Sequence, residues 1–131
     1  MLKRVGNLLK SRSSVYLLAI FYIFAGINHF INPGFYLPLI PDYLAEKEAI
    51  NIVSGAIEIL LGLLVLMPRF RRLSSWLIIA MLVAFIPSHL YFIQIGSCVD
   101  EGLCVDPIIG WGRLIIIHPL LIIWAYYVGK S

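Results

Sequence analysis

The stretch AINIVSGAIEILLGLLVLM, residues 49–67, decides the fold because it holds a single charged side chain, Glu58, among mostly apolar neighbours. A helix needs about 20 residues to cross the ~30 Å hydrocarbon core of a bilayer, so this stretch is long enough to span one. Three further stretches are similarly long and apolar: 14–31, 73–93 and 113–128. Because lipid admits only segments that satisfy their own backbone hydrogen bonds, each stretch is predicted to form a transmembrane helix.

The composition excludes an ordinary soluble domain. Hydrophobic residues make up 61% of the chain and charged residues 13%, whereas soluble domains carry about 25% charged residues. Basic residues precede the first stretch as in a signal peptide, but no small-residue cleavage site follows Ala19, so we expect this stretch to remain as a helix. Residues 1–131 are therefore predicted to form one all-α domain, an antiparallel bundle of four transmembrane helices.

Charge is distributed unevenly between the predicted loops. Basic residues occupy both termini and the turn between the second and third helices: Lys3, Arg4, Lys10, Arg12, Arg69, Arg71, Arg72 and Lys130. The other two loops carry mostly acids: Asp42, Glu46, Glu48, Asp100, Glu101 and Asp106, with Lys47. Because Lys and Arg favour cytoplasmic loops, both termini are predicted to lie in the cytoplasm, with the chain in the cell (inner) membrane. The lipid bilayer is the expected partner. Nucleic acid is not, because no basic patch with interleaved aromatics lies outside the helices.

The loop at residues 32–48 is rich in proline and apolar residues. Pro33, Pro38 and Pro41 predict that no regular helix runs through its first half. Its aromatic and aliphatic side chains are typical of a segment at the outer membrane interface. Two interpretations are open: a lid over the outer mouth of the bundle, or a loop merely anchored among lipid headgroups.

Glu58 is the residue whose placement most needs a reason. A carboxylate in the middle of a membrane helix costs roughly 2.5 to 3.5 kcal/mol on insertion scales. At ~100° per residue, the small and polar residues of this helix fall on one arc. They are Asn51, Ser54, Gly55, Glu58 and Gly62. We expect this stripe to face the interior of the bundle, where small residues let a neighbouring helix approach closely.

Three histidines and an arginine are predicted to lie near Glu58 in the outer half of the bundle. His29 comes from the first helix and His89, after Pro87, from the third, while Arg113 and His118 come from the fourth. Five positions correspond to about 140° around an α-helix, so Arg113 and His118 cannot both point straight inward. We predict that Glu58 and these four residues form a polar substrate-binding cluster.

Three roles are open for this cluster. It could be a buried hydrogen-bond network that fixes helix register, a binding site for a small molecule such as quinone, or a proton relay. A metal site is not expected, because no pair of ligands stands at i, i+4 spacing on one helix. No catalytic residue is assigned.

Cys98 and Cys104 both fall in the second outer loop. An oxidising compartment favours a structural disulfide between them. A redox-active pair and two free thiols are the alternatives, although this spacing is not that of a CxxC motif.

Several runs of sequence resemble the DoxX-like family of small membrane proteins. They are residues 25–30, Asn32-Pro33, residues 40–44, residues 54–62, the basic turn 69–75, and parts of the third and fourth helices. The resemblance implies a four-helix bacterial membrane protein linked to quinone-dependent thiosulfate oxidation, and relatives of the broader group include assembly factors. His29, Glu58 and Arg113 match polar positions of that family, whereas His89, His118 and the cysteine loop depart from its pattern.

The expected function is an accessory subunit of quinone- or thiol-linked membrane electron transfer, with quinone as its candidate cofactor. Whether the chain is itself an enzyme is left open. The alternative is a non-enzymatic factor that assists assembly or stability of other membrane proteins through its small-residue faces. Another membrane or redox protein, or a second copy of the chain, is then the expected protein partner.

Overall fold

The computed structural model describes residues 1–100 and 102–131, and this part of the chain contains helices but no β-strand. Glu101, counted above among the acidic loop residues, lies outside it. Four helical segments are long and apolar enough to cross a membrane: α2 (Arg12–Ile31), α4 (Lys47–Leu66), the pair α5 (Arg71–Ala84) and α6 (Ile86–Gln94), and the span Pro107–Val128. The all-helical prediction and its four long apolar helices are confirmed.

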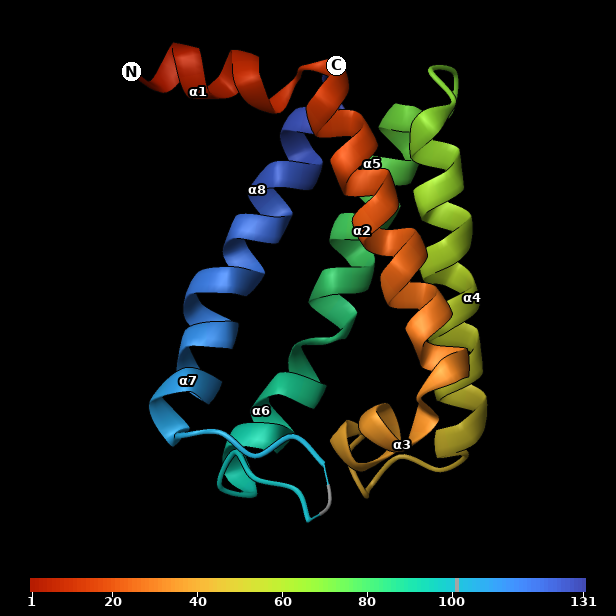
Figure 1. Cartoon of the computed structure of the whole chain (residues 1–131), viewed down its shortest axis with the longest axis vertical. Coiled ribbons are helices and arrows are strands. Elements are labelled where there is room, and N and C mark those ends of the chain that lie inside the picture. The colour runs from red at the N-terminus through yellow and green to blue at the C-terminus, as the bar shows by residue number, and fades with distance from the viewer. Residues whose placement is uncertain (101) are drawn as a thin grey trace.

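The four segments run alternately up and down (Figure 1). Both termini lie at one end, called here the terminal end. The short helix α3 (Pro33–Tyr36) and the connection between α6 and α7 (Pro107–Gly112) lie at the opposite end, called the lid end (Figure 1). All Lys and Arg residues except Lys47 and Arg113 belong to segments at or near the terminal end.

Helix α1 (Leu2–Leu9) was not predicted. It lies across the terminal end, outside the bundle of long helices (Figure 1). Gly6 is its buried residue, and a Cβ there would lie 3.2 Å from the ring of Tyr127. The other face carries exposed Leu2, Val5 and Leu8 beside basic residues, the pattern of a helix that lies in a membrane surface.

The last segment begins six residues earlier than the predicted 113, at Pro107. Asp106 is its N-cap, and the Asp106 side chain accepts a hydrogen bond from the backbone N–H of Ile108. Proline suits the first position of a helix because its missing N–H would be unpaired there anyway. The Asp-Pro pair is therefore the sequence signal for this helix start, and the predicted loop at residues 107–112 was wrong.

The third predicted helix is broken near Pro87. α5 ends at Ala84 and α6 starts at Ile86, because Pro87 has no N–H to continue the helical ladder. A second irregularity lies in the fourth segment, where the π-helical turn Arg113–Ile117 separates α7 from α8 (His118–Val128).

The residues of the proline-rich loop form short helical turns. Pro33 begins α3, and Pro38 lies within a 3₁₀ turn at Leu37–Leu39. The prolines were predicted to prevent a regular helix through this half, and only single helical turns form there, since proline is well suited to start one. A continuous helix is absent from residues 32–46, all of which the structure describes.

The densest packing lies in the half of the bundle toward the terminal end. Its buried apolar residues come from all four long segments: Val15, Leu18, Ala19, Tyr22, Leu61, Val65, Ile78, Met81, Leu82, Ala125 and Val128. The half toward the lid end is more open and holds the polar residues of the predicted cluster.

Candidate functional site

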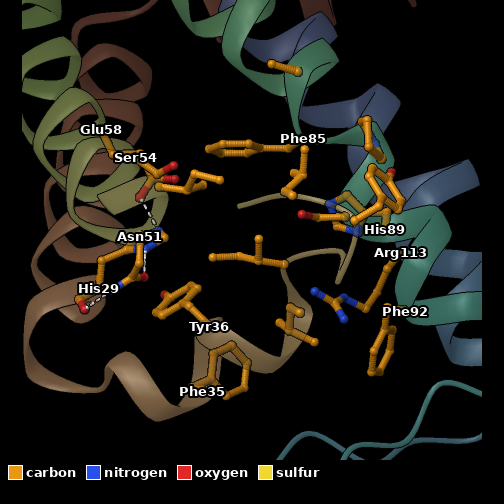
Figure 2. A pocket seen from close by; sticks show the side chains of 18 residues that line it. His29, Phe35, Tyr36, Asn51, Ser54, Glu58, Phe85, His89, Phe92 and Arg113 are labelled. Atoms are coloured by element: carbon orange, nitrogen blue, oxygen red, sulfur yellow. Dashed lines mark hydrogen bonds and ion pairs between the residues drawn. The ribbon is translucent and has the colours of Figure 1, made fainter. Parts of the chain in front are cut away.

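A cavity of about 550 Å³ occupies the lid-end half of the bundle. Its walls are α4 on one side and α6 with the start of the π-helical turn on the other, and residues 35–44 close its end (Figure 2). The volume falls within the range of pockets that hold small molecules. Most lining side chains are apolar or aromatic, and the polar ones are His29, Asn51, Ser54, Glu58, Ser88, His89 and Arg113.

Close contact between α2 and α4 builds the first wall. A Cβ on Gly26 would lie 2.6 Å from the backbone oxygen of Gly55, and one on Gly55 would lie 2.6 Å from the Cβ of His29. Nearer the terminal end in the same interface, Gly62 packs against Ile23 and Ala19. Only glycine fits at these three positions, and the close approach brings His29 against Asn51 and Glu58. The predicted inward stripe of α4 therefore faces α2.

His29 and Asn51 form two hydrogen bonds. Asn51 Nδ2 donates to the His29 backbone oxygen at 3.0 Å, and His29 Nδ1 lies 2.7 Å from Asn51 Oδ1. Because the Asn51 oxygen can only accept, His29 Nδ1 must carry a hydrogen and donate it. The second ring nitrogen, Nε2, is then left to face Glu58.

His29 Nε2 lies 3.2 Å from Glu58 Oε2, within ion-pair range but not aligned for a hydrogen bond. If the pair holds its remaining proton on Nε2, an imidazolium faces a carboxylate. If Glu58 holds it, both groups are neutral. Either arrangement has zero net charge, which makes the pair tolerable in an apolar interior. Glu58 is 6% exposed, and within the described residues its Oε2 has no hydrogen-bond partner.

The opposite wall carries Arg113 and His89. Figure 2 shows the guanidinium of Arg113 directed into the cavity. It packs over the ring of Phe92, with 5.2 Å from Cζ to the ring centroid. Its buried Nη1 finds no hydrogen-bond partner in the described part of the chain. A cationic donor without a hydrogen-bond partner therefore faces, across an apolar space, a carboxyl oxygen that contacts only His29.

The π-helical turn places Arg113 and His118 differently from the prediction. The backbone N–H of His118 bonds to the oxygen of Arg113, a five-residue step that brings the two positions nearer to one face of the helix. The predicted separation of about 140° assumed a regular α-helix, which this turn interrupts. As the prediction required, the two residues do not both point inward: Arg113 lines the cavity and His118 does not.

His118 is buried but does not line the cavity. Its Nε2 donates to the backbone oxygen of Leu82 in the last turn of α5, next to the break before Pro87. Its ring packs edge-on against His89, with centroids 4.8 Å apart. His118 thus joins α8 to α5, while His29, Glu58, His89 and Arg113 reach the cavity itself.

The segment 33–46 covers the lid end of the cavity and is held at both sides. Tyr36 stacks on His29, with ring centroids 3.7 Å apart, and its hydroxyl accepts a hydrogen bond from Asn28. Burial raises the pKa of Tyr36 above its ordinary value, the hydrogen bond from Asn28 opposes this, and the charge of Glu58 adds to it. The geometry fits the lid interpretation of this loop.

On the other side Asp42 joins the lid to α6 and to the start of α4. Its carboxylate accepts hydrogen bonds from Tyr91 Oη at 2.7 Å and from Lys47. The hydrogen bond from Lys47 lowers the pKa of Asp42 most, followed by that from Tyr91 and by the charge of Lys47.

Cys98 and Cys104 are joined by a disulfide on the exposed loop between α6 and α7. The two residues also pair in an isolated antiparallel bridge. Neither sulfur lines the cavity among the residues described.

Two residues that contact His29 were not among the predicted site residues. Asn51 belongs to the predicted stripe of α4, seven positions before Glu58, so the helical pattern already placed it on the right face. Tyr36 lies in a loop, and nothing in its sequence neighbourhood indicates a stack on His29. In the described ranges, no group of three or more His, Cys, Asp or Glu side chains is placed to hold a metal ion.

Comparison with known proteins gives one family match. Residues 18–129 match the model of a family described as Domain of unknown function (DUF8561). No curated protein and no solved structure matches the chain. The predicted membership of the DoxX-like family was therefore wrong. The residues that suggested it are small residues at helix contacts, prolines at helix ends and a basic turn, which helix packing and orientation favour in small membrane bundles generally.

Proposed function

This chain belongs to the DUF8561 family, and we propose that it is a multi-pass membrane protein that binds a small amphipathic molecule in its lid-end cavity. The observation that carries the proposal is that two polar groups lining the cavity lack a hydrogen-bond partner. Glu58 Oε2 and Arg113 Nη1 are both buried without a hydrogen-bond partner in the described chain. Buried polar groups are normally paired, so a ligand that satisfies both would gain binding free energy there.

Placement in a membrane is supported by the large apolar surface that the helices expose. Between 17% and 39% of each apolar span is buried within the chain. The remaining surface carries large hydrophobic side chains such as Phe24, Leu60, Leu77 and Ile115. A helix surface this apolar needs lipid or another protein around it.

The distribution of basic residues supports an orientation with both termini in the cytoplasm of a cell (inner) membrane. The lid and the disulfide loop would then face the outside, where disulfides form and persist. The amphipathic helix α1 would lie in the cytoplasmic surface of the membrane.

The cavity defines the chemistry of its ligand. A hydrogen-bond donor would face Glu58, and an acceptor or anionic group would face Arg113. The body of the molecule would be apolar or aromatic, because Phe85, Leu39 and Phe92 line the space between them. Electron transfer and quinone were expected mainly from the DoxX resemblance, and without that family the cavity supports binding but no particular redox chemistry.

The alternative of an assembly factor relied on small-residue faces that could dock other proteins. Gly26, Gly55 and Gly62 are already in contact within the chain, between α2 and α4. These positions offer no free surface to a partner, so the cavity supports the binding function better.

The test is to identify molecules that copurify with the chain. Wild type, Ser54→Phe and Val53→Phe would be purified in mild detergent and extracted for mass spectrometry. Ser54 lines the cavity and Val53, its neighbour, is exposed on the outer face. We expect a small amphipathic molecule in wild type and Val53→Phe, and its loss in Ser54→Phe. The same molecules in all three proteins would contradict the proposal.

Membrane placement is tested separately. The chain should stay with membranes after an alkaline carbonate wash, and a fluorescent protein fused to its C-terminus should fluoresce, as a cytoplasmic fusion does. Release of the chain by carbonate would contradict insertion. A C-terminal fusion that does not fluoresce, together with an active periplasmic reporter fused at the same position, would place the C-terminus outside.

A further inference from the structure

A second cavity, of about 610 Å³, lies at the terminal end between α5 and the end of α8. It is separate from the lid-end cavity, and the two share no lining residue. Its lining includes Arg72, Ser75, Trp76 and Ile79 of α5 with Tyr126 and Lys130. Gly129 and Ser131 complete the lining, and the Ser131 hydroxyl donates to the backbone oxygen of Lys10. Two cations, two serine hydroxyls and two aromatic rings thus surround one recess at the basic end of the bundle.

Ser75 is the residue that indicates a ligand. It is 1% exposed, and its Oγ has no hydrogen-bond partner among residues 1–100 and 102–131. The preceding Ser74 differs, because its Oγ donates to the backbone oxygen of Leu61 at 2.7 Å. Close packing forms the floor here, since a Cβ on Gly129 would lie 2.9 Å from Ser75 Cβ. The Ser75 hydroxyl at the floor of the recess is therefore a buried donor without a hydrogen-bond partner in the described chain.

Two exposed cations stand around this donor. Arg72 lies one turn before Ser75 on α5, and Lys130 follows the end of α8. The Lys130 ammonium lies 4.4 Å from the centroid of the Tyr126 ring, which holds it at the recess. In the described chain neither Arg72 nor Lys130 forms an ion pair with an acid. Two cations and a hydroxyl match a phosphate group, which accepts several charge-assisted hydrogen bonds.

The apolar side of the recess favours a lipid over a free anion. Trp76 and Tyr126 pack edge to face, with centroids 6.0 Å apart, and both are exposed at the bundle surface. Ile79 continues the lining one turn further along α5 toward the middle of the apolar span. Aromatic side chains prefer the headgroup level of a bilayer, with acyl chains below them.

We infer that this recess binds the phosphate headgroup of an anionic phospholipid of the cytoplasmic leaflet. Arg72 and Lys130 contact the phosphate, Ser75 donates a hydrogen bond to it, and the acyl chains lie along Trp76 and Ile79. Basic pockets between helices on the cytoplasmic side are suited to such headgroups. The inference goes beyond the lid-end ligand but rests on the proposed placement in a membrane.

The test measures lipid retention by native mass spectrometry of the full chain in detergent with equal phosphatidylglycerol and phosphatidylcholine. The pocket variant Arg72→Gln with Lys130→Gln removes two charges. The matched control Lys3→Gln with Arg4→Gln removes two charges from α1 at the same end. A basic residue close to an anionic lipid contributes about 1 kcal/mol, so losing both cations at the recess should weaken phosphatidylglycerol retention roughly 10- to 30-fold. The α1 variant should change retention much less, because Lys3 and Arg4 do not line the recess. Ser75→Ala should weaken retention several-fold without removing charge.

Three results would overturn the inference. Equal losses in the pocket and α1 variants would mean that only overall charge attracts the lipid. Equal retention of both lipids by wild type would mean that no anionic site exists. Displacement of phosphatidylglycerol by millimolar inorganic phosphate would assign the recess to the free anion. If the chain remains in carbonate-washed membranes and gives any of these three results, the lipid-binding inference is wrong but the proposed placement in a membrane still holds.

Discussion

Asn51 binds both the backbone oxygen and the ring nitrogen Nδ1 of His29, and so determines which nitrogen of that ring faces Glu58. The two residues come from different helices and are 22 positions apart in the chain. The bonds therefore hold α2 against α4 and orient the cavity wall at the same time.

Replacing Asn51 by Leu should destabilise the bundle. The His29 backbone oxygen lies in the last turn of α2, four residues before Pro33, which has no N–H to offer it, so this oxygen would lose the Asn51 amide. His29 Nδ1 would lose its buried acceptor as well, and leaving a buried group unpaired costs about 1 to 3 kcal/mol. Thermal unfolding in detergent, followed by circular dichroism, measures the loss. Asn7→Leu, at an exposed position of α1, is the control and should change the melting temperature little. Equal melting temperatures for wild type and Asn51→Leu would show that these bonds contribute nothing to stability.

Gly55→Ala should force α2 and α4 apart. The added methyl would meet His29 Cβ and the oxygen of Gly26, both at distances below normal contact. Overpacking of this kind typically costs about 1 to 3 kcal/mol, and here it would also displace His29 from Glu58. Gly34→Ala is the matched control, because a Cβ there meets nothing within 4 Å. The prediction fails if both alanine variants unfold at the temperature of wild type.

The disulfide loop gives a prediction about thiol accessibility. Cys98 and Cys104 are exposed and bonded to each other, so a membrane-impermeant maleimide should label neither in intact cells. Both should become labelled after mild reduction, if the loop faces the outside as proposed. Labelling without reductant would show free thiols, and protection even after reduction would place the loop on the cytoplasmic side.

The attachment of the lid through Asp42 should depend on pH. The pKa of Asp42 lies below its ordinary value of 3.8, chiefly because of the hydrogen bond from Lys47. A carboxylate with a lowered pKa stabilises the folded arrangement above its ordinary pKa, and this contribution disappears as the pH falls through the lowered pKa. Hydrogen-exchange protection of residues 33–46 should therefore fall as the solution is acidified below about pH 4.

Asp42→Asn provides the control for that measurement. It removes the titrating group, so protection of the lid should start lower and stay constant across the same pH range. A wild-type lid whose protection does not change with pH would show that the Asp42 contacts with Tyr91 and Lys47 do not hold it.

The sequence was sufficient to predict the four long apolar helices and the direction of Glu58, because unpaired backbone groups or an exposed acid in an apolar medium would cost much free energy. An acid in an apolar helix has to face inward, and the small residues that share its face mark where another helix packs. Asn51 could be placed by the same argument. The start of the last segment could also have been found, since Asp106 and Pro107 form a recognisable N-terminal pair.

Other parts of the site could not be derived from one sequence. The π-helical turn at Arg113–Ile117 changes the angular position of every later residue, and a helical projection assumes a constant angle. The stack of Tyr36 on His29 depends on how the lid folds back, which is a tertiary contact between a loop and a helix. The recess at Ser75 likewise exists only because Gly129 lets α8 pack closely against α5.

The balanced charge of the His29–Glu58 pair has an electrical consequence. A transmembrane voltage does work only on net charge that moves through the field, at about 2.3 kcal/mol per elementary charge per 100 mV for the full crossing. A proton that passes between Nε2 and Oε2 travels only 3.2 Å, a small part of the membrane thickness. Energising or depolarising the cell should therefore barely shift this proton from one of the two groups to the other.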